Sequence, residues 1–136
     1  MARSILVDAG FLVALLSDRD ARHRWAVTQA PLLPLPWKTC DAVLTEAFFV
    51  LGAHGVQGLT GLLRRGAVLS VFHLGDEVEE VLTLMQKYAN VPMSFADACL
   101  VRMTEALTDP VLLTTDADFR VYRRHSRQII PCIMPS

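Results

Sequence analysis

The sequence has 136 residues, and a chain of this length is expected to form a single domain, residues 1–136. Its formal net charge of −1 argues against binding of polyanions through net charge. Three cysteines without a C-x-x-C pair and four histidines without i, i+4 spacing argue against a secreted disulfide scaffold and against a zinc site, so we expect a cytoplasmic protein. Hydrophobic residues make up 52% of the chain, yet charges and glycines interrupt every apolar run before the ~18 residues of a membrane span. We therefore expect no membrane association, and an apolar surface that a partner or a second copy covers.

The first third of the chain alternates extended and helical patterns. "RSILVDAG" predicts a short buried strand that ends at Gly10, and "FLVALL" continues as a helix. A second helix is expected in "SDRDARHRWAVTQA", with Asp18 or Asp20 as its N-cap, and the prolines of "PLLPLPW" end it. A short strand is expected between those prolines.

The rest of the chain continues the same alternation. Helices are predicted for "CDAVLTEAFFVLGA", for the looser "GLTGLLRRG", for "DEVEEVLTLMQKYAN" and for "SFADACLVRMTEAL". Strands are predicted for "AVLSVFHL", "PVLLTT" and "QIIPCIMP", the last at a sheet edge because of Pro131. Strands that alternate with helices predict an α/β fold with a mainly parallel sheet, in which ligands bind beyond the carboxyl ends of the strands.

Two acids follow predicted strands directly. Asp8 comes after Ile5-Leu6-Val7, and Asp116 follows the strand that begins at Val111. Because parallel strands end at one edge of a sheet, we expect both carboxylates to face one crevice.

Glu46 lies within an apolar helical pattern. Its neighbours three and four positions away are Ala42, Val43, Phe49 and Val50. Their spacing places Glu46 on an expected buried stripe, where an unpaired carboxylate costs several kcal/mol. The two explanations are a buried salt bridge to an arginine and a bound metal ion.

Asp97 and Asp118 have a structural alternative. "SFAD" matches a capping box in which Ser94 is the N-cap and Asp97 reaches back from the third helical position. "TDAD" offers the same pattern, with Thr115 as N-cap and Asp118 as its partner, which leaves Asp116 as the ligand candidate. A first-turn residue can also face the crevice, so cap and ligand are compatible for Asp97.

A converging set of carboxylates requires compensation for mutual repulsion. Oxygen ligands of this kind select Mg²⁺ or Mn²⁺. Such a site suits hydrolysis of phosphodiester bonds, because the cation activates water and stabilises charge that develops at phosphorus. In "RVYRRHSR", Arg120, Arg123 and Arg124 are candidate contacts to nucleic-acid phosphates; a solvated helix face is the alternative.

The motifs "LVDAGFLVALL", "VLTEAFFVL", "SFADACLV" and "TTDADFRVY" occur in this order along the chain. Together they resemble the PIN domain family, especially the small toxin ribonucleases of bacterial VapBC toxin–antitoxin pairs. The resemblance implies a three-layer α/β/α sandwich with a central, mainly parallel sheet. It also implies Mg²⁺- or Mn²⁺-dependent RNA cleavage, a homodimer and a VapB-like antitoxin that covers the acidic crevice.

Within the resemblance, the catalytic and metal-binding acids fall on Asp8, Glu46, Asp97 and Asp116, with Thr114 and Asp118 in support. Dinucleotide-binding and P-loop proteins are excluded because neither glycine motif occurs. A haloacid-dehalogenase-like phosphatase would need an acid at the position of Gly10. The remaining alternative is a catalytically idle PIN-like module that acts by binding a partner or RNA.

Overall fold

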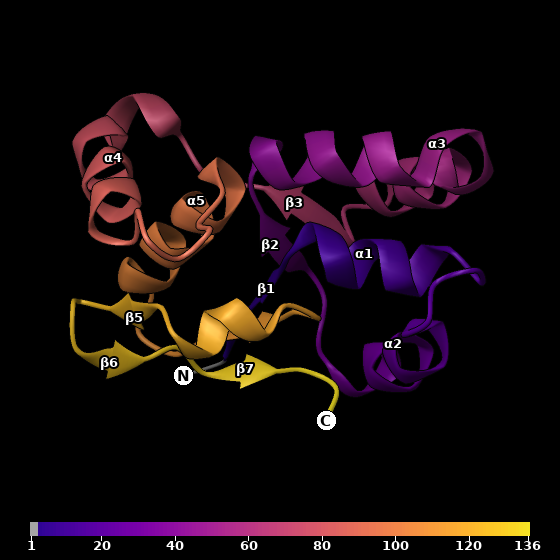
Figure 1. Ribbon diagram of the computed structural model, residues 1–136. Helices are drawn as coiled ribbons and strands as arrows, with labels where there is room; N and C mark the ends of the chain where they lie inside the picture. The colour runs from indigo at the N-terminus through magenta and orange to yellow at the C-terminus, as the bar shows by residue number, and fades with distance from the viewer. Residues whose placement is uncertain (1–2) are drawn as a thin grey trace.

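A parallel five-stranded sheet forms the centre of the computed structural model, which describes residues 3–136. The strand order is β3-β2-β1-β4-β7, and every pairing within this sheet is parallel (Figure 1). Its strands are β1 (Ser4–Val7), β2 (Trp37–Thr39), β3 (Val68–Ser70), β4 (Pro110–Leu113) and β7 (Cys132–Ile133). The predicted α/β class and parallel sheet are therefore confirmed.

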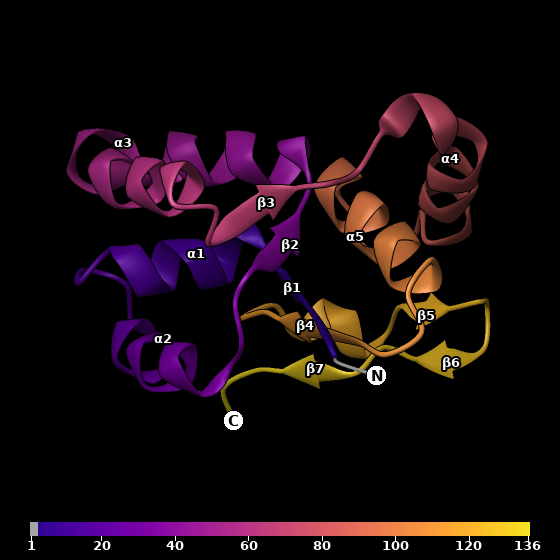
Figure 2. The same ribbon diagram turned by 180° about the vertical axis from the view of Figure 1, so that it is seen from behind.

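Helices lie on both sides of this sheet. They are α1 (Ala9–Leu16), α2 (His23–Gln29), α3 (Asp41–Arg64), α4 (Val78–Lys87) and α5 (Phe95–Glu105). The first three pack together on one side and α4 packs with α5 on the other, as both views show (Figures 1 and 2). A hairpin of β5 (Arg123–Arg124) and β6 (Gln128–Ile129) extends beyond the sheet on the side of α5.

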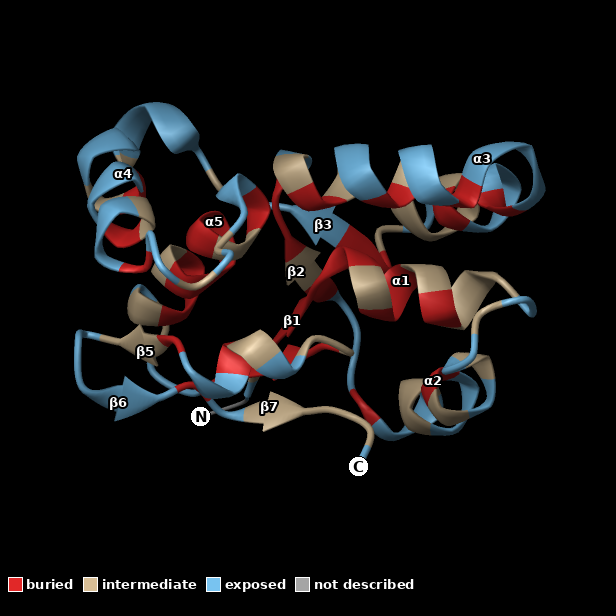
Figure 3. Ribbon diagram, in the orientation of Figure 1, coloured by how far each residue is buried: buried red, intermediate tan, exposed pale blue. Residues whose placement is uncertain are grey.

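The core explains why the central strands are continuously apolar. Every residue of β4 is buried, as are the last three of β1, because helices cover both faces of the sheet (Figure 3). Phe11 of α1 packs edge-to-face against Trp25 of α2 and Trp37 of β2, with ring centroids 5.8 and 5.6 Å apart. These contacts attach α1 and α2 to the sheet and fix the start of α1 beside the end of β1.

The two helices predicted for "CDAVLTEAFFVLGA" and "GLTGLLRRG" form one kinked helix, α3. The kink lies at Gly52, whose φ of 58° and ψ of −151° are outside the helical region. This backbone conformation is open to glycine and strained for other residues, so the chain changes direction without ending the helix. By length and composition α3 could also cross a membrane, a test that core helices of soluble proteins pass as well. The interruptions expected from the sequence, Glu46 and Gly52 among them, lie within this helix.

Several predicted boundaries differ from the structure. No aspartate side chain caps α2: its N-cap is Arg22, and Asp20 instead accepts a hydrogen bond from the Arg22 amide (2.8 Å). The short strand follows the prolines rather than lying between them, and β3 covers only part of "AVLSVFHL". The last predicted strand is divided at Pro131 into β6 and β7, because proline has no amide hydrogen to continue a ladder.

Candidate active site

The end of β1 and the end of β4 are joined through polar side chains. Asp8 follows β1 and is the N-cap of α1, where its Oδ1 accepts a hydrogen bond from the Phe11 amide (2.8 Å). The buried hydroxyl of Thr114, directly after β4, donates to Oδ2 of Asp8 and accepts from the Asp116 amide. Thr114 therefore holds the two strand-end acids in register, which agrees with its predicted supporting position.

Asp116, and not Thr115 as the sequence predicted, is the N-cap residue of the helical turn after β4. It is the N-cap of a 3₁₀ helix, Ala117–Arg120, and its Oδ1 accepts from the Asp118 amide (2.9 Å). The predicted capping box of Thr115 and Asp118 was wrong, because a 3₁₀ turn brings the amide two residues on within reach of the Asp116 side chain. Thr115 instead packs its hydroxyl against Gly10, where a Cβ atom would collide with it.

The capping box at α5 is confirmed. The Asp97 amide donates to Oγ of Ser94 (3.0 Å), and the Ser94 amide donates to Oδ2 of Asp97 (3.4 Å). The phenol of Tyr122 also donates to Oδ2 (3.3 Å). Asp97 is only half-buried and faces the cleft described next, so the capping role coexists with a position at the candidate site.

One cleft of about 590 Å³ brings the predicted acids together. Asp8, Glu46, Asp97 and Asp116 all line it, from the ends of β1 and β4, the second turn of α3 and the first turn of α5. Asp20 lines it as well, although the sequence suggested only a helix cap for that residue. Asp118 and Thr114 do not line the cleft, and Thr114 is fully buried. The cleft therefore unites four acids that are far apart in the sequence.

Glu46 lines this cleft from the exposed side of α3, and not from its buried stripe as predicted. The buried stripe of α3 runs through Val43, Ala47 and Leu51, not through Glu46, which is exposed. Phe49 and Val50, expected to bury it, are themselves 86% and 57% exposed. The buried-stripe prediction was wrong: Phe49 and Val50 expose apolar side chains on the same side of α3 as Glu46, and Val50 lines the cleft with it.

The three aspartates affect one another electrostatically. Burial, together with the charges of Asp97 and Asp116, raises the pKa of Asp8 to about 7, against the hydrogen bonds from Thr114 and the Phe11 amide. Burial and the charge of Asp116 also raise the pKa of Asp97. The charges of neighbouring carboxylates thus make ionisation of Asp8 and of Asp97 less favourable, and a cation in the cleft would reverse this effect.

The chemistry of the four carboxylates suits a hard divalent cation, but the distances between them are too long for three of them to bind one ion directly. Within residues 3–136, no three Asp, Glu, His or Cys side chains lie near enough together to hold a metal ion directly. All four predicted donors are carboxylates, and Mg²⁺ keeps several waters when only one or two carboxylates bind it directly. The site therefore fits Mg²⁺ or Mn²⁺ held partly through water.

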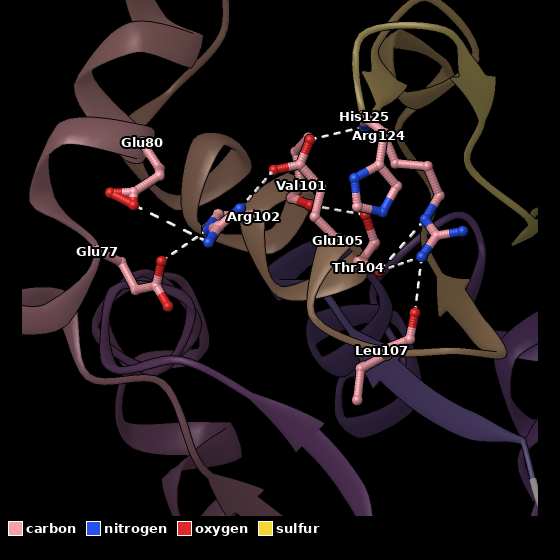
Figure 4. Close-up of polar contacts among 9 residues, drawn as sticks. All are labelled: Glu77, Glu80, Val101, Arg102, Thr104, Glu105, Leu107, Arg124 and His125. Carbon is pink, nitrogen blue, oxygen red and sulfur yellow. Dashed lines mark hydrogen bonds and ion pairs between the residues drawn. The ribbon is translucent and has the colours of Figure 1, made fainter.

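Two of the three predicted RNA-binding arginines are engaged within the fold. Arg124 donates from all three guanidinium nitrogens. Two of them donate to the carbonyl of Thr104 in the last turn of α5 and one of these also to the carbonyl of Leu107 just after it (Figure 4). The third donates to the side chain of Gln128. Arg123 donates from one nitrogen to three carbonyls of the preceding turn. The contacts of Arg124 fasten the β5–β6 hairpin to α5, and those of Arg123 fix the turn before it. Of the three arginines, only Arg120 is exposed.

An ion-pair network supports the same part of the fold. Arg102 of α5 contacts Glu77 at 2.6 Å and Glu105 at 3.2 Å. Glu105 in turn accepts a hydrogen bond from the His125 amide (2.7 Å), as Figure 4 shows. The network links the start of α4, α5 and the hairpin, and it stabilises the helix whose first turn carries Asp97.

Comparisons with known proteins agree with this architecture. A family model described as the PIN domain matches residues 5–124. Among solved structures, the chain is similar to VapC20 of Mycobacterium tuberculosis, described as a sarcin-ricin loop cleaving toxin, with a TM-score of 0.76 and 24% sequence identity. The match covers 87% of this chain and 94% of that one, and it shows a common fold. No curated protein matches the chain significantly.

Proposed function

The chain belongs to the PIN domain family, and we propose that it is a metal-dependent endoribonuclease, the toxin of a VapBC-type toxin–antitoxin pair. PIN domains are nucleases that generally use a divalent metal ion. The observation that carries the proposal is the single cleft lined by Asp8, Glu46, Asp97 and Asp116, the four acids that match the family motifs. VapC20 shares the fold and is described as a toxin that cleaves RNA at the sarcin-ricin loop, which supports the proposed substrate class.

In this proposal the four acids hold one or more Mg²⁺ or Mn²⁺ ions. A bound cation would supply Lewis-acid stabilisation of the negative charge that develops at the scissile phosphate. The chain's own part is to orient the acids: Thr114 hydrogen-bonds to Asp8 and accepts from the Asp116 amide, while Ser94 and Tyr122 donate to Asp97. Because burial raises the pKa of Asp8 to about 7, its carboxyl group is partly protonated near neutral pH, and a bound cation would favour the ionised form.

RNA must be held by groups outside the acidic cleft. No basic residue is among the described residues that line it. We propose that Arg120, which is exposed at the end of the 3₁₀ helix that Asp116 caps, contacts a flanking phosphate. The contribution of Arg123 is restricted to the nitrogens that do not bind carbonyls, and Arg124 acts through the fold.

We also propose that a second copy and a VapB-like antitoxin cover apolar surface on this protein. Phe49 and Val50 expose large apolar side chains next to Glu46, and a lone soluble domain gains nothing from such exposure. Size-exclusion chromatography with light scattering tests the homodimer. A Phe49→Ser variant that elutes unchanged would place the contact elsewhere.

Thermal unfolding with Mn²⁺ tests the proposed site without a guess about the RNA. Mn²⁺ should raise the wild-type midpoint, through a stabilisation of about 2.7 kcal/mol at a hundredfold excess over the dissociation constant. Asp97→Asn, which retains the helix cap, should lose most of that rise, whereas the exposed Asp18→Asn outside the cleft should keep it. Cleavage of single-stranded RNA should then require Mg²⁺ or Mn²⁺ and stop in Asp97→Asn.

The idle-module alternative predicts the opposite result. The wild-type midpoint would ignore Mn²⁺, Asp97→Asn would behave as a helix-cap variant only, and RNA would be bound but remain intact. That combination would remove the nuclease proposal.

A further inference from the structure

The two oxygens of the Asp97 carboxylate are in different environments. Oδ2 accepts from the Ser94 amide at 3.4 Å and from the Tyr122 hydroxyl at 3.3 Å. In the part of the chain that the structure describes, Oδ1 has no hydrogen-bond donor, although Asp97 lines the cleft. The terminal torsion of an aspartate is soft, so donors on one oxygen are what decides where the other oxygen points.

Tyr122 is rigidly placed for this contact. It is fully buried, and its ring packs edge-to-face against Tyr88 and Phe119, with centroids 5.2 and 5.3 Å apart. Tyr88 is itself fixed, because its hydroxyl accepts a hydrogen bond from the Arg123 amide (3.0 Å). The aromatic cluster therefore holds the Tyr122 hydroxyl in a fixed place, within hydrogen-bond distance of Asp97 in the first turn of α5.

The hydroxyl of Tyr122 has two acceptors within reach and one proton to donate. Besides Oδ2 of Asp97, the carbonyl of Pro92 lies 3.4 Å away. An ionised carboxylate is the stronger acceptor, so the proton goes to Asp97 when Asp97 is charged. Burial and the charge of Asp97 raise the pKa of Tyr122, which keeps the phenol protonated and able to donate.

We propose that Tyr122 is a positioning residue that holds Oδ2 of Asp97 and thereby directs Oδ1 into the cleft as a ligand for the divalent cation. The inference rests on the proposed function, since it assigns the cation to the same acids. It goes beyond that function because Tyr122 lines no part of the cleft and is not one of the four acids, although it is the last residue of the motif "TTDADFRVY". Tyr122 acts only through Asp97.

The test compares Tyr122→Phe with Tyr88→Phe, two variants that each remove one hydroxyl from the same aromatic cluster. Mn²⁺ affinity is obtained from thermal midpoints measured over a range of Mn²⁺ concentrations, and metal-free stability from urea unfolding with a chelator. Tyr122→Phe should bind Mn²⁺ about tenfold more weakly, the factor expected for one hydrogen bond to a charged group. Tyr88→Phe should bind Mn²⁺ as the wild type does, even where its metal-free stability falls.

RNA cleavage supplies a second readout. At limiting Mn²⁺ the rate of Tyr122→Phe should fall, and excess Mn²⁺ should restore it, while KM for RNA stays unchanged. Equal Mn²⁺ affinity in Tyr122→Phe and wild type would overturn the inference and leave the proposed nuclease intact. Equal weakening in both variants would also overturn it, because ring packing rather than the hydroxyl would then be responsible. A wild type that does not bind Mn²⁺ would overturn the proposed function and this inference together.

Discussion

Replacement of Asp8 by asparagine should stabilise the metal-free protein at neutral pH. Asp8 is 6% exposed, and its pKa rises from 3.8 to about 7 on folding, chiefly through burial. Between these two values the folded chain holds a proton that the unfolded chain has released, so the free energy of unfolding falls as pH rises. At about 1.4 kcal/mol per pH unit the total loss is about 4 kcal/mol, complete above about pH 7. Asparagine does not titrate, so Asp8→Asn avoids this loss.

Urea unfolding of both proteins in the presence of a chelator, from about pH 4 to about pH 8, measures the difference directly. Other titrating groups are common to both chains and cancel in the comparison. The two curves should separate steadily with rising pH and run parallel above about pH 7, with Asp8→Asn the more stable. Asp18→Asn, a change at an exposed acid outside the cleft, serves as the matched control and should follow the wild type. Parallel curves for wild type and Asp8→Asn over the whole range would refute the electrostatic reasoning.

Three other substitutions test the framework around the acids. Thr114→Val should lower the free energy of unfolding by about 1 to 3 kcal/mol in urea, because it removes the donor to Asp8 and the acceptor for the Asp116 amide in a buried site. Arg124→Gln should lower the thermal stability of the fold, because it removes the bonds to the end of α5. Arg120→Gln should leave thermal stability unchanged and lower the salt dependence of RNA binding by about one phosphate contact. The reverse pattern would exchange the roles of the two arginines. Gly52→Ala should lower the free energy of unfolding in urea by about 1 to 3 kcal/mol, because φ is 58° at this position. An unchanged free energy of unfolding would show that the kink relaxes into regular helix.

The order of strands and helices could be predicted because both faces of the sheet are covered. Continuous apolar segments such as Ile5–Val7 occur where a strand is buried on two sides, and the acid after such a segment must lie at the sheet edge. Short elements could not be predicted in this way. The strands β5 and β6 and the 3₁₀ helices are too short to show a helical or strand periodicity in the sequence. Long-range contacts, such as that of Arg124 with the end of α5, decide where these short elements form.

Glu46 lines the predicted cleft although the premise that led to it, a place on the buried stripe of its helix, was wrong. The periodicity of "VLTEAFFVL" is compatible with two apolar faces of one helix, and sequence alone does not tell which of them meets the core. In the structure the face of Val43 and Ala47 is buried against α1 and the sheet, and the face of Phe49 is exposed. Exposed apolar residues beside an acid are a feature of a contact surface, and composition does not distinguish them from a core.

The structure confirms the helix cap at Asp97, and the geometry of all three aspartates shows that a cap is compatible with a place at the cleft. Asp8 is the N-cap of α1, Asp116 is the N-cap of a 3₁₀ helix, and Asp97 lies in the capping box of α5. Each receives hydrogen bonds from backbone amides at a point where a strand has ended or a helix begins, and amides at these points favour negative charge. Capping is therefore how the fold gathers mutually repelling carboxylates at one edge of the sheet. The same contacts leave part of each group directed toward the cleft, so asparagine substitutions should separate the two roles: they preserve the caps and remove the charge that a cation requires.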